Sequence, residues 1–302
     1  MTTSATAVPA TDHRSSFRPG RLVEPIVRYT IYLVIAIVFL LPFIWMFFGS
    51  VRREIEIHSL MFPFNWHTIV PVEWTLQSYL DIFGISEEGA KGGLRFQRGL
   101  MNSGIIAVGV VSSSMLFNTM AAYFFARLPF PGKKYLTAYV LATFLLPFEV
   151  TVVPLYLVVS TLGLRNTYWA MIVPFYASPF IVFMLTQFLG TIPKDLDEAA
   201  LVDGANFWQI LWKIIFPNAL PAIATAALIG FQMNWNSINA AVATSSLDLQ
   251  VIQVMIAAQT SDRQVYYGRT FAGLVSATLP VLILFLFGQR YYFRGAVLSG
   301  MK

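Results

Sequence analysis

The sequence has no cysteine, only three histidines and few charged residues, which make up 12% of its 302 positions. The absence of cysteine excludes a disulfide scaffold, thiol catalysis and thiolate metal sites. His13, His58 and His67 lie outside the long apolar runs, so we expect no histidine-built metal site within those runs. Soluble domains average about 25% charged residues, so this chain carries too little charge for a water-soluble fold.

Apolar residues are abundant instead. They make up 57% of the sequence, and the mean hydropathy is +0.65. This composition excludes an intrinsically disordered chain. The net charge of +5 comes from basic residues scattered along the chain. A nucleic-acid surface would gather them in a patch or stripe, so the lipid bilayer is the expected partner and nucleic acid is not.

Long windows without Asp, Glu, Lys or Arg predict membrane-spanning helices. These windows are 29–51, 99–126, 135–148, 150–164, 166–193, 214–247 and 270–289. About 20 apolar residues cross a bilayer as a helix. Only Glu149 separates the third window from the fourth, so we interpret the two as one span. The sequence therefore predicts an all-α membrane protein with six spans, near 26–50, 100–126, 135–160, 167–190, 217–236 and 270–290; the runs are too long for barrel strands.

The spans divide the chain into segments on two sides of the membrane. Residues 1–25 are expected to be a disordered cytoplasmic N-terminus, 51–98 an external loop and 291–302 a cytoplasmic tail. The core, 99–290, holds the other five spans. With both termini inside, cytoplasmic segments contain 12 of the 20 Lys and Arg residues, in agreement with the positive-inside rule. The first span follows a long polar segment, which indicates an uncleaved anchor rather than a signal peptide.

One loop is strongly patterned. Pro193 suits a first helical turn, acidic residues follow it, and Gly204 suits a left-handed helix end. A second amphipathic helix follows, and its apolar stripe is formed by Phe207, Ile210, Leu211, Ile214 and Ile215. The pattern predicts a helix-turn-helix on the cytoplasmic surface. On pattern alone, a loop that merely connects the fourth and fifth spans is the alternative.

The spacing in this loop resembles the EAA loop of ABC importer permeases, and we call residues 191–217 the EAA loop below. That motif reads E-A-A, three residues, G, nine residues, I-x-L-P. The residues that carry the match are Glu198, Ala199, Ala200, Asp203, Gly204, Ala205, Ile214 and Pro217. Phe216 replaces the usual Leu, and Ser237 stands after "NWN" (234–236), where an acidic residue is frequent.

Further segments extend the resemblance over about 26–302. They include "MNSGIIAVG" (101–109), "AAYFFARLPFPGKK" (121–134) and "QRYYFRGAVLSGMK" (289–302). They are similar to carbohydrate-uptake permeases of the maltose and glycerol-3-phosphate type, specifically to the six-span second permease. The resemblance implies the type I ABC importer permease fold with cytoplasmic coupling helices. It also implies a bacterial or archaeal inner-membrane location and import of a sugar, oligosaccharide or polyol-phosphate.

The resemblance implies partners as well. They are a second permease, expected as a heterodimer, two ATP-binding subunits that the EAA loop contacts, and an external solute-binding protein. The sequence itself has no G-x-x-x-x-G-K-[ST] phosphate-binding motif, and its nearest fragment at 131–134 lacks the first Gly and the Ser or Thr. We therefore expect no enzyme activity, no catalytic residue, no metal and no cofactor in this chain.

Four residues are candidates for the pore or the solute site. Glu149 is the only acidic residue within a predicted span, and such residues usually face a cavity or a partner; the alternative is that it reaches the outer interface. Asn234, Trp235 and Asn236 combine an indole with two amides, which suits a sugar; the alternative is an interfacial aromatic belt.

Two other function classes compete with the permease interpretation. A stand-alone secondary transporter would carry coupling carboxylates in its spans and internal repeats, and only Glu149 is available. A membrane enzyme would need a cluster of acid, base or metal ligands, and no such cluster is visible in the sequence.

Overall fold

The computed structural model describes residues 20–60, 63–237, 246–261 and 265–299, and the chain divides into two compact units, Met1–Trp45 and Met46–Lys302. The first unit contains most of α1 (Gly20–Ser50). This helix begins at Gly20, so part of the predicted disordered terminus is helical; residues 1–19 lie outside the described residues. The apolar stretch Pro25–Ser50 is long enough to cross a membrane.

The second unit consists of helices joined by loops, and in its described ranges the only β pairing is an isolated bridge between Arg52 and Trp74. Four short helices form the predicted external loop: α2 (Glu54–Ser59), α3 (Trp66–Ile69), α4 (Gln77–Ile82) and α5 (Glu87–Lys91). The remaining elements are α6 (Phe96–Arg127), α7 (Lys133–Phe144), α8 (Phe148–Thr161), α9 (Tyr168–Ile172), η1 (Val173–Phe175), α10 (Pro179–Thr191), α11 (Asp195–Val202), α12 (Phe207–Gln209), η2 (Ile210–Ile215), α13 (Phe216–Trp235), η3 (Leu247–Leu249), α15 (Ile252–Ser261) and α16 (Tyr267–Ser299).

The six predicted spans correspond, in the described ranges, to four continuous helices and two bent helix pairs. The continuous helices are Pro25–Ser50, Phe96–Arg127, Phe207–Trp235 and Tyr267–Gln289. Together they agree with the predicted all-α membrane fold. α16 continues to Ser299, beyond the predicted end of the last span at 290.

The third and fourth predicted spans are not single helices, which corrects the sequence interpretation. The third is divided into α7 and α8, which meet at 99°, and the fourth bends by 43° between η1 and α10. Proline explains both breaks, because it lacks an N–H and disfavours a helical conformation in the residue before it. Pro147 precedes α8 with an extended ψ of 141°, and Pro179 is the first residue of α10.

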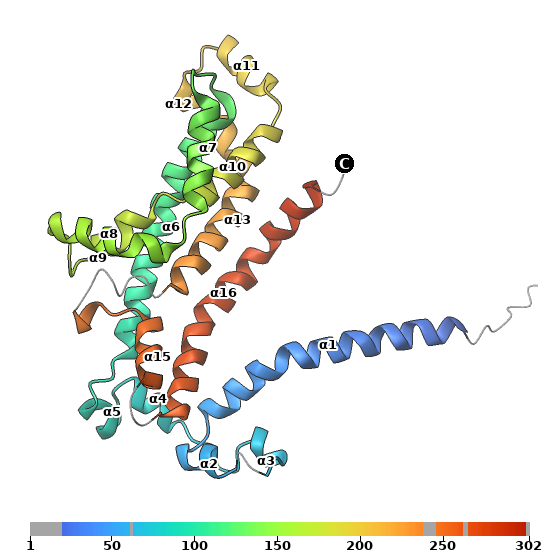
Figure 1. Ribbon diagram of the computed structural model, residues 1–302. Coiled ribbons are helices and arrows are strands. Elements are labelled where there is room, and N and C mark those ends of the chain that lie inside the picture. The colour runs from blue at the N-terminus through green and yellow to red at the C-terminus, as the bar shows by residue number, and fades with distance from the viewer. Residues whose placement is uncertain (1–19, 61–62, 238–245, 262–264, 300–302) are drawn as a thin grey trace, which may run out of the picture. The chain divides into compact units, whose positions relative to one another are not determined.

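The core of the second unit forms around α6. This helix packs along α10 and α13, and α13 packs in turn along α16. Figure 1 shows α11 and α12 at one end of this bundle and α4, α5 and α15 at the opposite end. A cluster of buried apolar residues near the first end joins α6, α10, η2 and α13, and includes Leu185, Leu189, Leu211 and Ile215. A second cluster near the other end includes Ile82, Phe96 and Ile252.

Carboxylates attach α2 and α4, in the predicted external loop, to the start of α16. The two Glu54 side-chain oxygens accept hydrogen bonds from the backbone N–H groups of Tyr267 (2.7 Å) and Gly268 (2.8 Å), which caps the positive end of the helix. Asp81 of α4 forms an ion pair with Arg269 at 2.8 Å. The first turn of α16 is therefore held by charged side chains from α2 and α4.

Candidate functional site

The first helix of the EAA loop, α11, ends as its sequence predicts. Gly204 has φ +79°, in the left-handed region that favours glycine. The N–H of Ala205 donates to the carbonyl of Ala200 (2.9 Å), and the N–H of Gly204 donates to that of Leu201 (3.0 Å). This pair of bonds is the Schellman pattern, which satisfies carbonyls at the end of a helix. Gly204 thus fixes the turn between α11 and α12.

Gly204→Ala is expected to lower the free energy of unfolding by about 1 kcal/mol, because a Cβ is disfavoured at positive φ. No atom lies within 4 Å of the added Cβ, so a steric clash adds nothing. Thermal unfolding in one detergent measures the change. Gly190→Ala is the matched control, since Gly190 lies in α10 with equally open space; there alanine should be neutral or stabilising. Equal effects at both glycines would contradict the strain argument.

The second helix of the loop is continuous with the fifth span. Asn206 begins it through a capping box with Gln209, and the predicted stripe faces the protein, with Ile210, Leu211 and Ile215 buried. The segment Ile210–Ile215 has π-helical geometry. Pro217 explains this widening, because it lacks the N–H that would bond the carbonyl four residues earlier.

The tip of the loop exposes both charge and apolar surface. Glu198, Ala199 and Asp203 are exposed, whereas Ala200 is buried. Leu201 and Val202 are also exposed, at 60% and 88%. The sequence analysis missed these two apolar side chains. Their positions in the sequence, which do not fall on the buried face of α11, could have indicated that they are exposed. The remaining motif residues lie at the base, with Ala205 and Ile214 half-buried and Pro217 exposed.

A buried ion pair joins the loop to the end of α6. Arg127 Nε lies 3.2 Å from Asp197 Oδ2, and the side chains are only 4% and 15% exposed. Arg127 also donates to the carbonyl of Ile192 (2.7 Å). Burial raises the pKa of Asp197 above its ordinary value, the Arg127 guanidinium opposes this rise, and neighbouring Glu198 adds to it. Because 70 positions separate the partners, no sequence pattern predicted the pair.

The candidate pore residues differ in exposure and in hydrogen bonding. Glu149 lies exposed in the first turn of α8, where a helix N-terminus favours a carboxylate, and not in the middle of an unbroken span. The Asn234 side chain donates to the carbonyl of Gly230 in its own helix (2.8 Å). Asn236 directly follows the last residue of α13, and its side chain is exposed.

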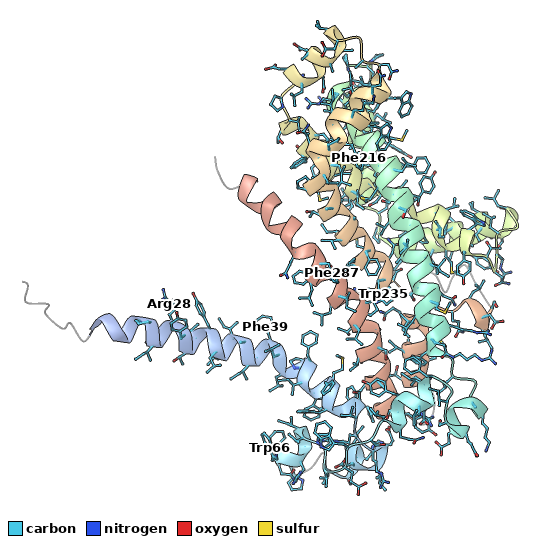
Figure 2. The ribbon with its side chains drawn as sticks, turned by 180° about the vertical axis from the view of Figure 1, so that it is seen from behind. Arg28, Phe39, Trp66, Phe216, Trp235 and Phe287 are labelled. Carbon is cyan, nitrogen blue, oxygen red and sulfur yellow. The ribbon has the colours of Figure 1, made fainter. Side chains whose placement is uncertain are left out.

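Trp235 is placed differently from the expectation of a sugar-facing indole. It is 3% exposed, stacks on Phe231 with ring centroids 5.4 Å apart, and donates its indole N–H to the carbonyl of Ala277 (3.0 Å). Figure 2 shows it beside α16. In this conformation the ring belongs to the interface between α13 and α16, because an indole that is both apolar and hydrogen-bonded suits a buried position.

Two cavities flank α13 and were not identified from the sequence. One, of about 410 Å³, lies between α13 and α16 and has polar groups from Gln232, Thr278 and Gln289 on an otherwise apolar wall. The other, of about 400 Å³, is bounded by α6, α13 and α16 and is almost entirely apolar apart from Ser112. Polar side chains in a membrane-spanning bundle mark candidate pathways, so the first cavity is the better candidate.

Comparison with known proteins decides the family. Residues 118–295 match the family described as "Binding-protein-dependent transport system inner membrane component". A diacetylchitobiose uptake system permease protein of Streptomyces coelicolor is 30% identical over 87% of this chain and 84% of its own length. The chain belongs to this family of transport permeases.

Two further comparisons agree in sequence and fold. An arabinooligosaccharides transport system permease protein of Halalkalibacterium halodurans is 29% identical to this permease over 93% of the chain and 99% of its own length. A chain from the crystal structure of a bacterial ABC transporter involved in the import of the acidic polysaccharide alginate superposes with a TM-score of 0.76. It is 22% identical and covers 92% of this chain and 99% of its own.

Family membership resolves the competing function classes. The chain is a membrane-embedded permease subunit of an ABC importer, so it is not a stand-alone secondary transporter, the alternative that the sequence left open. The family is a transport component and not an enzyme. The EAA loop and the cavities beside α13 are therefore the candidate transport features of this permease.

Trp235→Phe tests the structural placement of the indole in the permease. The variant keeps the ring stacking but removes the hydrogen bond to Ala277, so we expect a loss of about 1 kcal/mol in the free energy of unfolding. Uptake by the assembled importer should be unchanged once the amounts of complex are matched. Phe231→Leu, which removes the stacked ring from the other side, is the companion variant. A selective loss of solute affinity in Trp235→Phe would restore the sugar-facing interpretation.

Proposed function

We propose that this permease forms half of the pathway of an ATP-driven importer for a sugar, oligosaccharide or polyol-phosphate, and that its EAA loop contacts the ATPase. The observation that carries the proposal is the geometry of that loop. Its exposed tip presents Glu198, Asp203, Leu201 and Val202, while its base is buried in the core through the stripe on η2. A rigid base with an exposed, mixed surface suits a protein–protein contact.

The energy source lies outside this chain in the proposal, because the sequence has no phosphate-binding loop of its own. Two ATP-binding subunits would provide it, with Glu198 facing a basic group on one of them. A second permease would complete the pathway as a heterodimer, and an external binding protein would deliver the solute. The family description, which names binding-protein-dependent transport, supports this division of labour.

The orientation follows from the same partners. The ATP-binding subunits are cytoplasmic, so the EAA loop and both termini are placed inside an inner membrane of a bacterium or archaeon. The distribution of basic residues supports this choice. Helices α4, α5 and α15, at the opposite end of the bundle (Figure 1), are then external.

The carbohydrate class rests on the relatives, whose names refer to diacetylchitobiose and to arabinooligosaccharides. Within this chain, Gln232, Thr278 and Gln289 line the cavity beside α13. Thr278 and Gln289 donate to carbonyls of α16, but the side-chain oxygens of all three can still accept hydrogen bonds from the hydroxyls of a sugar. Glu149 and Asn236 remain candidates at the surface. Asn234 and Trp235 are bonded within the protein and would have to rearrange to reach a solute.

The deciding experiment is affinity purification of this chain from its native membrane in mild detergent, followed by mass spectrometry. We expect an ATP-binding subunit and a second permease to be recovered with it. Recovery of the folded chain alone would overturn the proposed assembly. A solute-binding protein recovered with the complex then allows a screen of mono- and oligosaccharides, polyol phosphates, amino acids and metal ions, in which tight binding of an amino acid or a metal ion would contradict the substrate class.

A further inference from the structure

Arg127 occupies an unusual position, because it is the last residue of α6 and contacts both sides of the connection between α10 and α11. On one side it donates to the carbonyl of Ile192, directly after α10. On the other it forms the ion pair with Asp197, in the first turn of α11. One guanidinium therefore sets the direction in which α11 leaves the bundle.

The pair is buried, so each charge is stabilised mainly by the other and not by solvent. Removal of one partner would leave the other charged and almost without solvent, which proteins tolerate poorly. The hydrogen bonding is also incomplete in the described part of the chain, where Arg127 Nε and Asp197 Oδ1 lack well-aligned partners. The two side chains consequently hold each other by charge more than by a saturated hydrogen-bond network.

The pair also connects the exposed tip to α6, the helix around which the core of the second unit forms. Asp197 directly precedes Glu198, the residue assigned to the ATPase contact. α11 otherwise packs against η2, and among the described residues Arg127–Asp197 is the only ion pair that links α11 to a membrane-spanning helix. α6 in turn packs along α10, α13 and α15, so a shift at its end would extend through the bundle.

We propose that Arg127 and Asp197 are a positioning pair that transmits displacement of α11 to α6 when the ATPase closes. This inference rests on the proposed function, because it requires an ATPase partner at α11. The pair thus acts on the transport cycle through α6, in addition to the apolar contacts of η2. Neither residue contacts the solute.

The absence of native cysteine in this chain makes the proposal directly testable. Met101→Cys introduces a thiol at an exposed site on α6, far along the helix from Arg127. The co-purified complex is reacted with a hydrophilic thiol reagent, with and without ATP and vanadate. The ratio of the labelling rates at position 101 with and without nucleotide reports displacement of α6. This measurement does not require the solute to be known.

The test variant is Arg127→Met combined with Asp197→Leu, which removes both charges at once and leaves neither unpaired. We expect this double variant to assemble and hydrolyse ATP while its rate ratio moves toward one. The nucleotide response should fall by at least about fivefold, the lower end of typical coupling between sites. Lys133→Met is the matched control, because Lys133 also donates to a backbone carbonyl near the end of α6 but has no acidic partner among the described residues.

Several outcomes would overturn the positioning role. They are a rate ratio unaffected by nucleotide in Met101→Cys itself, and an undiminished response in the double variant. If the double variant does not assemble, Arg127→Gln combined with Asp197→Asn, which removes both charges with little change of shape, replaces it. Loss of assembly in both would show that the pair serves folding alone. Failure of the proposed function is separate, because the purified sample would then contain no ATP-binding subunit.

Discussion

Glu198→Lys is expected to weaken association of the permease with its ATP-binding subunit about a hundredfold, because losing one member of a desolvated charge pair is costly at an interface. Reversal of the charge adds repulsion from the basic group that we propose opposite it. Solute uptake in cells should fall in proportion to assembly. The association is measured by titrating the purified ATP-binding subunit against detergent-solubilised permease.

Glu87→Lys is the matched control for this result. Glu87 is also an exposed glutamate in the first turn of a short helix, but it lies on α5 at the opposite end of the bundle, where it forms an ion pair with Lys91 at 3.4 Å. Its reversal should leave the association with the ATP-binding subunit unchanged. Equal weakening by both variants would indicate a nonspecific charge effect, and normal association of Glu198→Lys would contradict the proposed docking of the EAA loop.

Arg269→Met is expected to lower the free energy of unfolding by about 3 kcal/mol, because it strands a buried carboxylate. Asp81 and Arg269 are only 7% and 13% exposed and lie 2.8 Å apart. Asp81 keeps hydrogen bonds from Ser86 and Gln77, which compensate only part of the loss. Thermal or denaturant unfolding of the purified permease in a fixed detergent measures the effect.

Arg53→Met is the matched control, because it removes an exposed ion pair in place of a buried one. Arg53 and Glu73 are also 2.8 Å apart, but they are 62% and 61% exposed. Exposed ion pairs contribute little, so this variant should cost no more than about 0.5 kcal/mol. Similar costs at the two sites would show that burial does not control the strength of these pairs.

The Asp81 pair should also make stability depend on pH. Burial alone raises the pKa of Asp81, but hydrogen bonds from Ser86, Arg269 and Gln77 outweigh it, so the pKa lies below the ordinary value of 3.8. A carboxylate with a lowered pKa adds stability that is present above 3.8 and is lost as pH falls below it. The free energy of unfolding should therefore fall more on acidification in the native permease than in the Arg269→Met variant. Equal acid sensitivity would contradict this assignment.

The local features of the fold were predictable because nearby residues determine them. Charge-free windows identified the spans, since the bilayer excludes charge wherever a helix crosses it. Gly204 identified the end of α11, because only glycine adopts a left-handed conformation at no cost. The stripe on η2 identified its buried face through the periodicity of a helix. These signals also carried the resemblance to importer permeases.

The breaks in the third and fourth spans were partly visible. Pro147 and Pro179 stand at the break points, yet prolines inside membrane helices are often tolerated. Pro42 and Pro280 lie within α1 and α16, which remain continuous here. Whether a proline breaks a helix depends on neighbouring groups that can satisfy the freed carbonyls, and those groups come from other parts of the chain.

The sequence by itself determined the class of protein, the membrane-spanning segments and the position of the EAA loop, because each depends on composition or on spacing within a few turns. Only the tertiary structure decided that Arg127 meets Asp197, that Asp81 meets Arg269 and that Trp235 is buried against α16. Each of these contacts joins residues at least 42 positions apart. Their energies depend on desolvation, and desolvation is set by how the helices pack rather than by the residues alone.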